Sequence, residues 1–427
     1  MIQKIIVPKG LHGTVTVPGD KSISHRALMI SALADGACEV TGLSGAADPV
    51  STKTCLQSLG VEITERKNVT TVYGKGLHGL QAPKETLDAG NSGTTLRLLT
   101  GILSGQRFSS EMTGDESLRK RPMKRVMEPL QSMGADIRGT AEFTAPLRVN
   151  PVQKLKPISY DMPLASAQVK SAILLAGLYA EGITTVIEST PTRDHTERML
   201  GLRVVERGGK QVAEVRGGMN ITPCSFIVPG DISAAAFFVA AGMLVPNAEI
   251  RIQNVGLNPT RTAVLDVFRQ MGGKIQVENR REISGEPIGD IVARTSELRS
   301  GFELKGGRVA AVIDEIPVIA VVAACSTGVF SVRDAKELRA KESDRIASIV
   351  SNLRALGLGV EEYDDGFAFE STGNLHGSRL QSYDDHRVAM AFAVAGLRAS
   401  GETEIGDAEC VDISFPGFWN ELRKLSA

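Results

Sequence analysis

Hydrophobic residues recur along the chain as Ala-rich apolar stretches, each closed by Gly or Pro and followed by a β-branched segment. Such a stretch predicts a buried helix that leads into a strand. Six copies occur, spaced by roughly 65 to 85 residues, as in repeat architectures or slightly longer. They span residues 26–40, 95–108, 170–186, 234–250, 316–332 and 387–405.

A second pattern alternates with the first. It is an amphipathic helix that ends in a Leu-Gly or Met-Gly step and continues as a strand, with Gly supplying the left-handed helix stop. It occurs at residues 56–63, 130–137, 268–275 and 353–360, with a weaker match at 199–205. Each unit of about 70 residues therefore holds two helices and several strands, and six units fill the chain.

A repeated turn marks the domain boundary. VPGDKS at 17–22 recurs as VPGDIS at 228–233, about half a chain later. The repetition predicts an α/β (α+β) fold of two similar domains with three units each, joined by paired crossovers. We expect the first domain to span residues 20–229. The second would combine residues 1–19 with 230–427.

Composition narrows the function classes. The 427-residue chain is 42% apolar and 23% charged with a formal net charge of −1, which indicates a soluble globular protein. The charge and an aromatic content of only 4% argue against nucleic acid as a partner. The longest apolar stretches fall short of the ~20 residues that a membrane span needs, and the N-terminus lacks the long apolar core of a signal peptide.

Cysteine usage indicates the compartment. The five cysteines, at positions 38, 55, 224, 325 and 410, are scattered and odd in number, with no C-x-x-C pair. This spacing favours reduced thiols in a cytoplasmic protein and supports neither a disulfide framework nor a zinc site. We expect no metal and no cofactor, and a monomer whose partners are small molecules.

The segment 17–26, VPGDKSISHR, predicts a turn followed by a helix that opens on Ser22 or Ser24. A helix start offers free N–H groups and the positive end of the dipole, so it favours an anion. Lys21 and Arg26 add positive charge there, and Ser22 adds a short donor. The alternative is an ordinary helix cap flanked by two solvated cations.

Similar starts precede the other apolar helices. GNSGTT at 90–95 is a Gly-rich loop suited to an anion, and PLASAQVKS places Ser166 and Gln168 in a first helical turn. Asp231 and Ser233 form a start without a cation, which we interpret as a structural cap. The remaining two starts contain Asp314, followed by Pro317 at a position suited to the first helical residue, and the pair Asp385 and Arg387.

Two further segments of the sequence contain clusters of cationic residues. In LRKRPMKR at 118–125 we expect Arg121, held beside Pro122, to point inward, and the other cations to form a solvated face. KESDRI at 341–346 predicts Lys341 and Arg345 on one helical face with Glu342 beside them. Two cations four residues apart repel each other unless an anion lies between them, which favours a ligand site.

If these starts converge at the domain junction, one cleft combines several cations with the carboxylates of Asp314, Glu342 and Asp385. Such a site suits a reaction between two anionic small molecules. The cations are Lys21, Arg26, Arg121, Lys341, Arg345 and Arg387. Neither a Ser-His-Asp order nor metal-ligand spacing nor a complete dinucleotide or P-loop fingerprint occurs, and His25 and His386 are expected to hold local structure.

Taken together, the motifs closely resemble the 5-enolpyruvylshikimate-3-phosphate (EPSP) synthase family, the 3-phosphoshikimate 1-carboxyvinyltransferases. The match comprises PGDKSISHR, GNSGT, KRP, SAQ, TRDHTE, DEIP, KESDR and DDHR, in order across nearly the whole chain. The resemblance implies two domains of three βαβαββ units each, with the active site in the inter-domain cleft. It also implies transfer of the enolpyruvyl group of phosphoenolpyruvate to the 5-hydroxyl of shikimate 3-phosphate, with release of phosphate. Glyphosate competes with phosphoenolpyruvate in this family.

The resemblance also assigns residues. Those expected to hold shikimate 3-phosphate are Lys21, Ser22, Arg26, Ser166, Ala167, Gln168, Arg193, Asp314 and Lys341. Those expected to hold phosphoenolpyruvate are Lys21, Gly93, Arg121, Gln168, Arg345 and Arg387. Asp314 would accept the 5-hydroxyl proton, and either Glu342 or Lys21 would protonate the methylene carbon, giving a tetrahedral intermediate that loses phosphate.

The chain departs from the family at three positions. Ser414 stands where some members have Lys, Ala167 where some have a second Ser, and Leu98 where a Pro is found. Two alternative functions stay open. One is the sister enolpyruvyl transferase that acts on a UDP-amino sugar (UDP-N-acetylglucosamine), although the Lys-Asn pair and loop Cys typical of it are missing. The other is a non-catalytic anion-binding repeat protein, against which the Asp314 carboxylate argues.

Overall fold

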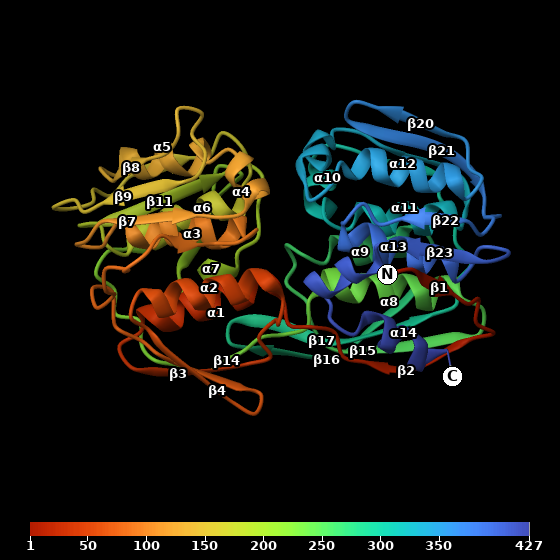
Figure 1. The fold of residues 1–427 in the computed structure, drawn as a ribbon, viewed down its shortest axis with the longest axis horizontal. Coiled ribbons are helices and arrows are strands. Elements are labelled where there is room, and N and C mark those ends of the chain that lie inside the picture. Colours follow the sequence, from red (N-terminus) through yellow and green to blue (C-terminus); the bar gives the residue numbers. More distant parts are fainter. Residues whose placement is uncertain (427) are drawn as a thin grey trace. The chain divides into compact units, whose positions relative to one another are not determined.

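The computed structural model describes residues 1–426, which form two compact units (Figure 1). The first unit contains Gly19–Val228 together with Glu282–Glu286. The second contains Met1–Pro18, Pro229–Arg281 and the chain from Pro287 onward. These divisions lie one residue from the boundaries expected from the repeated turn. The segment Glu282–Glu286, which joins the first unit, was not anticipated.

The first unit contains three four-stranded sheets of one design. Their strand orders are β14-β3-β5-β4, β6-β7-β9-β8 and β10-β11-β13-β12; in each the first pair is parallel and the other two are antiparallel. The strands are β3 (Ala37–Thr41), β4 (Glu62–Arg66), β5 (Val69–Tyr73), β6 (Leu87–Asp88), β7 (Ser110–Thr113), β8 (Asp136–Arg138), β9 (Leu147–Asn150), β10 (Ser159–Asp161), β11 (Ile183–Glu188), β12 (Arg203–Arg207), β13 (Lys210–Arg216) and β14 (Phe226–Ile227).

Two of the three sheets of the second unit repeat this design, and the third has three strands. The sheets have the orders β16-β17-β15-β2, β18-β19-β21-β20 and β1-β23-β22, with β2–β15, β18–β19 and β22–β23 parallel. The strands are β1 (Gln3–Ile5), β2 (Leu11–Val15), β15 (Ala248–Gly256), β16 (Lys274–Ile283), β17 (Glu286–Arg294), β18 (Phe302–Leu304), β19 (Thr327–Val332), β20 (Val360–Tyr363), β21 (Gly366–Thr372), β22 (Arg379–Gln381) and β23 (Thr403–Gly406).

Helices connect these strands and fill the core of each unit. In the first unit they are α1 (Lys21–Leu33), α2 (Ala47–Ser58), α3 (Gly93–Leu103), α4 (Glu116–Lys120), α5 (Lys124–Ser132), α6 (Ala167–Gly177) and α7 (His195–Leu200). In the second they are α8 (Ile232–Leu244), α9 (Ala263–Gln270), α10 (Gly307–Val312), α11 (Ile316–Ala324), α12 (Arg345–Ala355), α13 (His386–Gly396) and α14 (Phe418–Leu425), with 3₁₀ helices η1 (Lys336–Ala340) and η2 (Ala408–Ile413).

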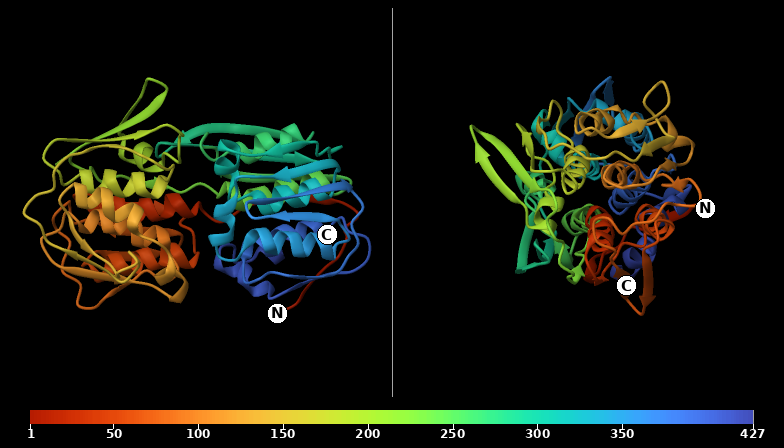
Figure 2. Two further views of the ribbon diagram at one scale, coloured as in Figure 1. Left: turned by 90° about the horizontal axis from the view of Figure 1, so that it is seen from above. Right: turned by 90° about the vertical axis from the view of Figure 1, so that its left-hand side faces the viewer.

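The predicted Ala-rich helices are the most buried elements. Every residue of α8 and α11 is buried, as expected for helices that are apolar on all sides. Within each unit these helices pack together, α1 with α3 and α3 with α6, and α11 with α8 and α13. The sheets lie around them (Figure 2). Each unit therefore has its own hydrophobic core, and no helix within residues 1–426 is long and apolar enough to cross a membrane.

The repeated VPGD turn explains the paired crossovers. Strand β2 belongs to the second unit, yet it continues through Val17–Asp20 into α1 of the first. Strand β14 belongs to the first unit and continues through Val228–Asp231 into α8 of the second. Each of these two strands is therefore followed, across its VPGD turn, by a helix of the other unit. Strand β14 completes the sheet of β3 in the first unit, and β2 completes the sheet of β15 in the second. Glycine is required at Gly19, where a Cβ would lie 1.9 Å from the Gly42 carbonyl oxygen.

Candidate active site

Helix α1 begins one to three residues earlier than predicted. Its cap is Asp20, whose carboxylate accepts from the Ile23 N–H at 2.9 Å, so α1 starts at Lys21 and not at Ser22 or Ser24. An Asp at this position satisfies an N–H group that would otherwise be unpaired. The consequence is that Lys21 and Ser22 both lie in the first turn.

The two cations of this segment have partners within the first unit. Lys21 Nζ donates to Asp48 Oδ2 at 2.9 Å, from the first turn of α2. Arg26 is 3% exposed and donates to the Thr196 hydroxyl, the Ser171 hydroxyl and the Ser22 carbonyl at 2.8, 2.7 and 2.9 Å. Desolvation lowers the pKa of Arg26 to about 10. Three of its five N–H donors are thus fixed by protein.

The Gly-rich loop forms the start of α3. Ser92 caps the helix by accepting from the Thr95 N–H, and Gly93 is the first helical residue. A Cβ at Gly93 would lie 2.5 Å from Arg97 Nη1 and 3.6 Å from Arg121 Nη1. Glycine therefore lets two guanidinium groups approach the backbone closely.

Gln168 connects this loop to α6. Its Oε1 accepts from Arg97 Nη1 at 2.7 Å, and its Nε2 donates to the Thr94 hydroxyl at 2.8 Å. Ser166 caps α6 by accepting from the Val169 N–H at 3.4 Å, and Ala167 is the first helical residue. The predicted start of α6 is confirmed for Gln168, which lies in the first turn, whereas Ser166 is the cap residue before it. Arg97, which the prediction did not assign to the site, joins it through Gln168.

Arg121 differs from its cationic neighbours. It follows α4 and is half-buried, whereas Arg119, Lys120, Lys124 and Arg125 are exposed. Its Nη2 donates to Asn91 Oδ1 at 2.7 Å in the Gly-rich loop. The predicted contrast between Arg121 and the rest of the basic run is therefore present in the structure.

Arg193 lies in the loop that precedes α7 and is half-buried. It contributes to the electrostatic surroundings of Arg26, whose pKa it helps to lower. The first unit thus brings Arg193, Arg26 and the start of α6 into one polar region, since Ser171 of α6 and Thr196 of α7 both accept from Arg26.

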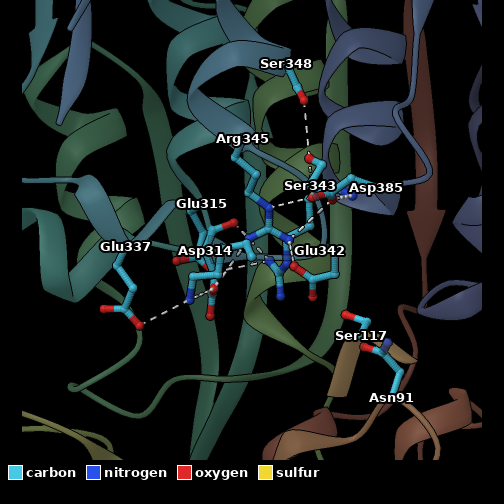
Figure 3. A network of polar contacts seen from close by, with 12 residues as sticks. Asn91, Ser117, Asp314, Glu315, Glu337, Glu342, Ser343, Arg345, Ser348 and Asp385 are labelled. Carbon is cyan, nitrogen blue, oxygen red and sulfur yellow. Dashed lines mark hydrogen bonds and ion pairs between the residues drawn. The ribbon is translucent and has the colours of Figure 1, made fainter. Parts of the chain in front are cut away.

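In the second unit the predicted residues converge on Asp314. Its Oδ1 lies 3.4 Å from Lys341 Nζ and 3.7 Å from Arg345 Nη1, and its backbone carbonyl accepts from Arg387 Nη1 at 3.1 Å. Figure 3 shows Asp314 and Arg345 in one network with Glu342 and Asp385. Three cations from two separate segments therefore surround the carboxylate that was predicted to act as the base.

The predicted shared helical face of Lys341 and Arg345 is wrong. Lys341 is the cap residue that follows η1, and Arg345 begins α12 after the cap Asp344. The two cations approach each other because both face Asp314. The i,i+4 spacing was misleading because Asp344 competes as a helix cap, accepting from the Ala347 N–H at 3.0 Å.

Arg345 is the most constrained of these cations. It is 1% exposed, and its Nε donates to Asp385 Oδ2 at 2.7 Å while Nη2 donates to Glu342 Oε2 at 2.6 Å. Despite opposing desolvation, the Asp385 and Glu342 carboxylates raise the pKa of Arg345, and Arg345 keeps the pKa of Asp385 low. Its Nη1 is buried without a hydrogen-bond partner among residues 1–426.

Glu315, near Arg387, was not predicted to belong to the site. Glu315, the cap residue of α11, lies 3.8 Å from Arg387 Nη1 and accepts from the Ser233 hydroxyl. Ser233 in turn accepts from Arg261 Nη2 at 2.7 Å. Nearby carboxylates, Asp314 first and then Glu315, raise the pKa of Arg387 against desolvation. A charged residue beside Asp314 just before a fully apolar helix was the available signal for Glu315.

The carboxylates change the expected charge of this region. Lys341, Arg345 and Arg387 face Asp314, Glu342, Asp385 and Glu315. In the second unit these three cations therefore lie among four carboxylates, three of which were named from the sequence. Its cations are held in place by carboxylates, which fixes the geometry of their remaining donors.

His25 and His386 are both buried. His25 is fully buried with Nδ1 2.6 Å from the Thr52 hydroxyl, and His386, 4% exposed, is the first residue of α13. Among residues 1–426 there is no cluster of three or more His, Cys, Asp or Glu side chains that could hold a metal ion. Of the three departures, Leu98 is buried in α3, and Ser414 has a buried hydroxyl with no partner in the described chain.

The fold has solved counterparts. The enolpyruvyl transferase NikO from Streptomyces tendae aligns over 100% of this chain and 97% of its own with a TM-score of 0.77 at 18% identity, a likeness of fold. EPSP synthase from Acinetobacter baumannii aligns over 99% and 98% with a TM-score of 0.89 at 43% identity. The architecture is therefore that of the enolpyruvyl transferases.

Sequence comparison narrows the class to one family. The 3-phosphoshikimate 1-carboxyvinyltransferases of Salinibacter ruber and Bacillus cereus (strain G9842) are 52% and 48% identical to this chain, covering 100% and 98% of both partners. The family model of EPSP synthase matches residues 6–422. The chain belongs to the EPSP synthase (3-phosphoshikimate 1-carboxyvinyltransferase) family, as the motifs predicted.

Proposed function

We propose that this protein is a 3-phosphoshikimate 1-carboxyvinyltransferase. It joins the C2 carbon of phosphoenolpyruvate to the 5-hydroxyl oxygen of shikimate 3-phosphate. In the addition step the hydroxyl loses its proton and the methylene carbon gains one, which gives a tetrahedral intermediate. In the elimination step the bond from C2 to the phosphate oxygen breaks, a methyl proton leaves, and inorganic phosphate is released.

The site residues divide between the two substrates. We assign Lys21, Ser22, Arg26, Ser166, Ala167, Gln168, Arg193 and Lys341 to shikimate 3-phosphate, and Lys21, Gly93, Arg121, Gln168, Arg345 and Arg387 to phosphoenolpyruvate. Asp314 contacts the acceptor and takes its 5-hydroxyl proton. Glu342 or Lys21 supplies the proton to the methylene carbon.

One observation carries this proposal more than any other. Lys341, Arg345 and Arg387, from two motifs, all contact Asp314, and Arg345 keeps a buried Nη1 without a hydrogen-bond partner in the described chain. A buried donor of this kind is costly unless a ligand accepts from it. An anionic substrate beside a carboxylate base provides that acceptor, and the pairing of base and cations suits proton abstraction next to bound anions.

Phosphate release tests the proposal directly. The protein is mixed with shikimate 3-phosphate and phosphoenolpyruvate, and each substrate is omitted in turn. Release that requires both substrates is the expected result. Release that requires a UDP-amino sugar in place of shikimate 3-phosphate would move the function to the sister enzyme, and no release with either acceptor would leave an anion-binding protein.

We also propose a cytoplasmic monomer. The five cysteines, all unpaired and four of them buried, support a reducing compartment. Sedimentation at micromolar concentration is expected to give one species of the chain's mass, 45.5 kDa. A species of twice that mass would contradict the monomer.

A further inference from the structure

Lys170 is an unusual residue of the first unit. It lies in the second turn of α6 and is 0% exposed. Its ammonium group is 2.7 Å from Glu188 Oε2 and 2.7 Å from Glu197 Oε1, and it donates to the Thr192 carbonyl at 3.4 Å. Burying an ion is costly, and a buried ion pair is weak as a source of stability. The arrangement therefore calls for a role other than packing.

The partners of Lys170 come from separate segments. Glu188 ends β11, Thr192 lies in the loop that follows it, and Glu197 belongs to α7. The Thr192 hydroxyl also donates to Glu188 Oε1. Lys170 thus joins the body of α6 to both ends of the 189–194 loop, which contains Arg193 immediately after Thr192.

The same two helices hold Arg26. Ser171, next to Lys170 on α6, accepts from Arg26 Nη2, and Thr196, next to Glu197 on α7, accepts from Arg26 Nε. The Thr196 hydroxyl donates to Ser171 at 2.8 Å. The contact of Lys170 with Glu197 and the contact of Arg26 with Thr196 therefore fix α7 from two adjacent positions.

A third side-chain contact holds α7 at its start. His195 Nδ1 is 2.7 Å from Glu286 Oε1, both groups being at most 2% exposed. A helix of six residues has little stability of its own. Its position therefore depends on these side-chain contacts, and Lys170 also donates to the carbonyl of Thr192, the residue before Arg193.

The electrostatic surroundings of Glu197 support a specific function for its pairing with Lys170. Burial raises the pKa of Glu197 despite the opposing effect of Lys170. Its Oε2 is buried without a hydrogen-bond partner among residues 1–426. Lys170 contacts the Glu197 carboxylate, so loss of the ammonium group would remove one of the links that hold α7 against α6.

We propose that Lys170 is a positioning residue for acceptor binding: it holds α7 and the 189–194 loop so that Arg26 and Arg193 face the anionic acceptor beside the start of α6. This inference rests on the proposed function for the identity of the acceptor. It assigns a role to the buried part of the SAQVK and TRDHTE segments, which the substrate assignment leaves unused.

The test compares steady-state constants for Lys170→Met with those of the wild type. A displacement of about 1 Å in a positioned group can cost about a hundredfold in rate, so we expect KM for shikimate 3-phosphate to rise about 10- to 100-fold. KM for phosphoenolpyruvate, whose assigned residues lie mainly elsewhere, is expected to change less than about threefold, by the same argument. Titration with shikimate 3-phosphate alone is expected to show the same loss in Kd.

Two further variants separate positioning from stability. Lys170→Met combined with Glu197→Gln removes one charge of each sign and so restores charge balance, but it does not restore the bridge. The double variant is therefore expected to regain part of the stability, because Glu188 stays without its cation, and to keep the acceptor defect. Val149→Ala, in the buried core of the first unit at β9, serves as a control for destabilisation and is expected to leave both KM values unchanged.

Each outcome has a clear meaning. A double variant with wild-type KM for the acceptor would overturn the positioning role, as would equal increases in KM for both substrates in Lys170→Met. If Lys170→Met does not fold, the double variant decides the question. Absence of phosphate release by the wild type would contradict the proposed function instead, before any variant is compared.

Discussion

Asp385 and Arg345 form a fully buried ion pair in which Nε lies 2.7 Å from Oδ2, with side-chain exposures of 0% and 1%. Asp385 also caps α13 by accepting from the Arg387 N–H at 2.9 Å. One carboxylate therefore orients a cation of α12 through its side chain and a cation of α13 through its helix start. This double role makes Asp385 a support for two residues that we assign to phosphoenolpyruvate.

Asp385→Asn separates these two roles, because Asn caps helices as well as Asp but cannot balance the charge of Arg345. Removing one partner of a buried ion pair costs about 3 to 5 kcal/mol of unfolding free energy. We expect a loss near the lower end, measured by urea unfolding, and a rise of at least about tenfold in KM for phosphoenolpyruvate, the factor that 1.4 kcal/mol of binding supplies. Unchanged stability together with an unchanged KM would contradict the proposed role of Asp385 as a support for Arg345 and Arg387.

Asp314→Asn removes the proposed base and keeps the size of the side chain. General-base catalysis contributes about 10²- to 10⁴-fold, so turnover is expected to fall in that range. Binding of shikimate 3-phosphate, measured by titration calorimetry, is expected to stay within a few fold. Asp266→Asn, an exposed carboxylate on α9 of the same unit, is the matched control. Turnover near the wild-type value in Asp314→Asn would exclude it as the base.

Gly93→Ala tests the close approach of two guanidinium groups to the Gly-rich loop. A Cβ would lie 2.5 Å from Arg97 Nη1, and because that atom is the end of a flexible side chain, Arg97 moves and its bond to Gln168 is lost. Loss of a charged hydrogen bond costs about 1.5 to 3 kcal/mol. We expect kcat/KM for phosphoenolpyruvate to fall about 10- to 100-fold, the equivalent of that energy.

The unfolding free energy of Gly93→Ala is expected to fall by no more than the ~1.5 to 3 kcal/mol of that hydrogen bond, since Gly93 is a helical residue without a positive φ and the displaced atom can move. Gly359→Ala is the matched control because a Cβ there has no neighbour within 4 Å. Its kinetic constants are expected to equal those of the wild type. A Gly93→Ala variant with unchanged kcat/KM would show that Arg97 and Arg121 do not depend on the small residue.

The sequence predicted the repeats well because each has local signals. An Ala-rich helix, a Gly stop and an alternating strand are all encoded within about 70 residues, and the two VPGD turns marked the crossovers. The helix starts at Ser92, Ser166, Asp231 and Asp385 were predictable for the same reason, since a cap residue adjoins its helix.

The missed features depend on contacts between distant residues. Glu315 contacts Ser233 and Arg387, and Lys170 contacts Glu188 and Glu197. Neither pairing has a local signature. A lysine inside an apolar helix was a visible anomaly, but its partners could be known only from the fold. The wrong helical face at Lys341 arose because spacing alone cannot reveal that Asp344 starts a new helix.

The last prediction concerns acid stability and His25. Burial lowers the pKa of His25 to about 3, whereas the unfolded chain has the ordinary value near 6.5. Below pH 6.5 the unfolded state therefore takes up a proton that the folded state does not, and stability is lost as pH falls from 6.5 toward 3. The slope is about 1.4 kcal/mol per pH unit, so the loss from His25 at pH 4.5 is about 3 kcal/mol.

His25→Asn removes this titration and keeps a polar group near the Thr52 hydroxyl that Nδ1 contacts. We expect the variant to be less stable than the wild type at pH 7, and the difference between them to shrink by about 3 kcal/mol at pH 4.5, from the same slope. Urea unfolding at both pH values measures it. His376→Asn, at an exposed position near Ser400, is the control: its unfolding free energy should differ from that of the wild type by the same amount at both pH values. A pH-independent difference for His25→Asn would show that the buried imidazole is not what limits stability in acid.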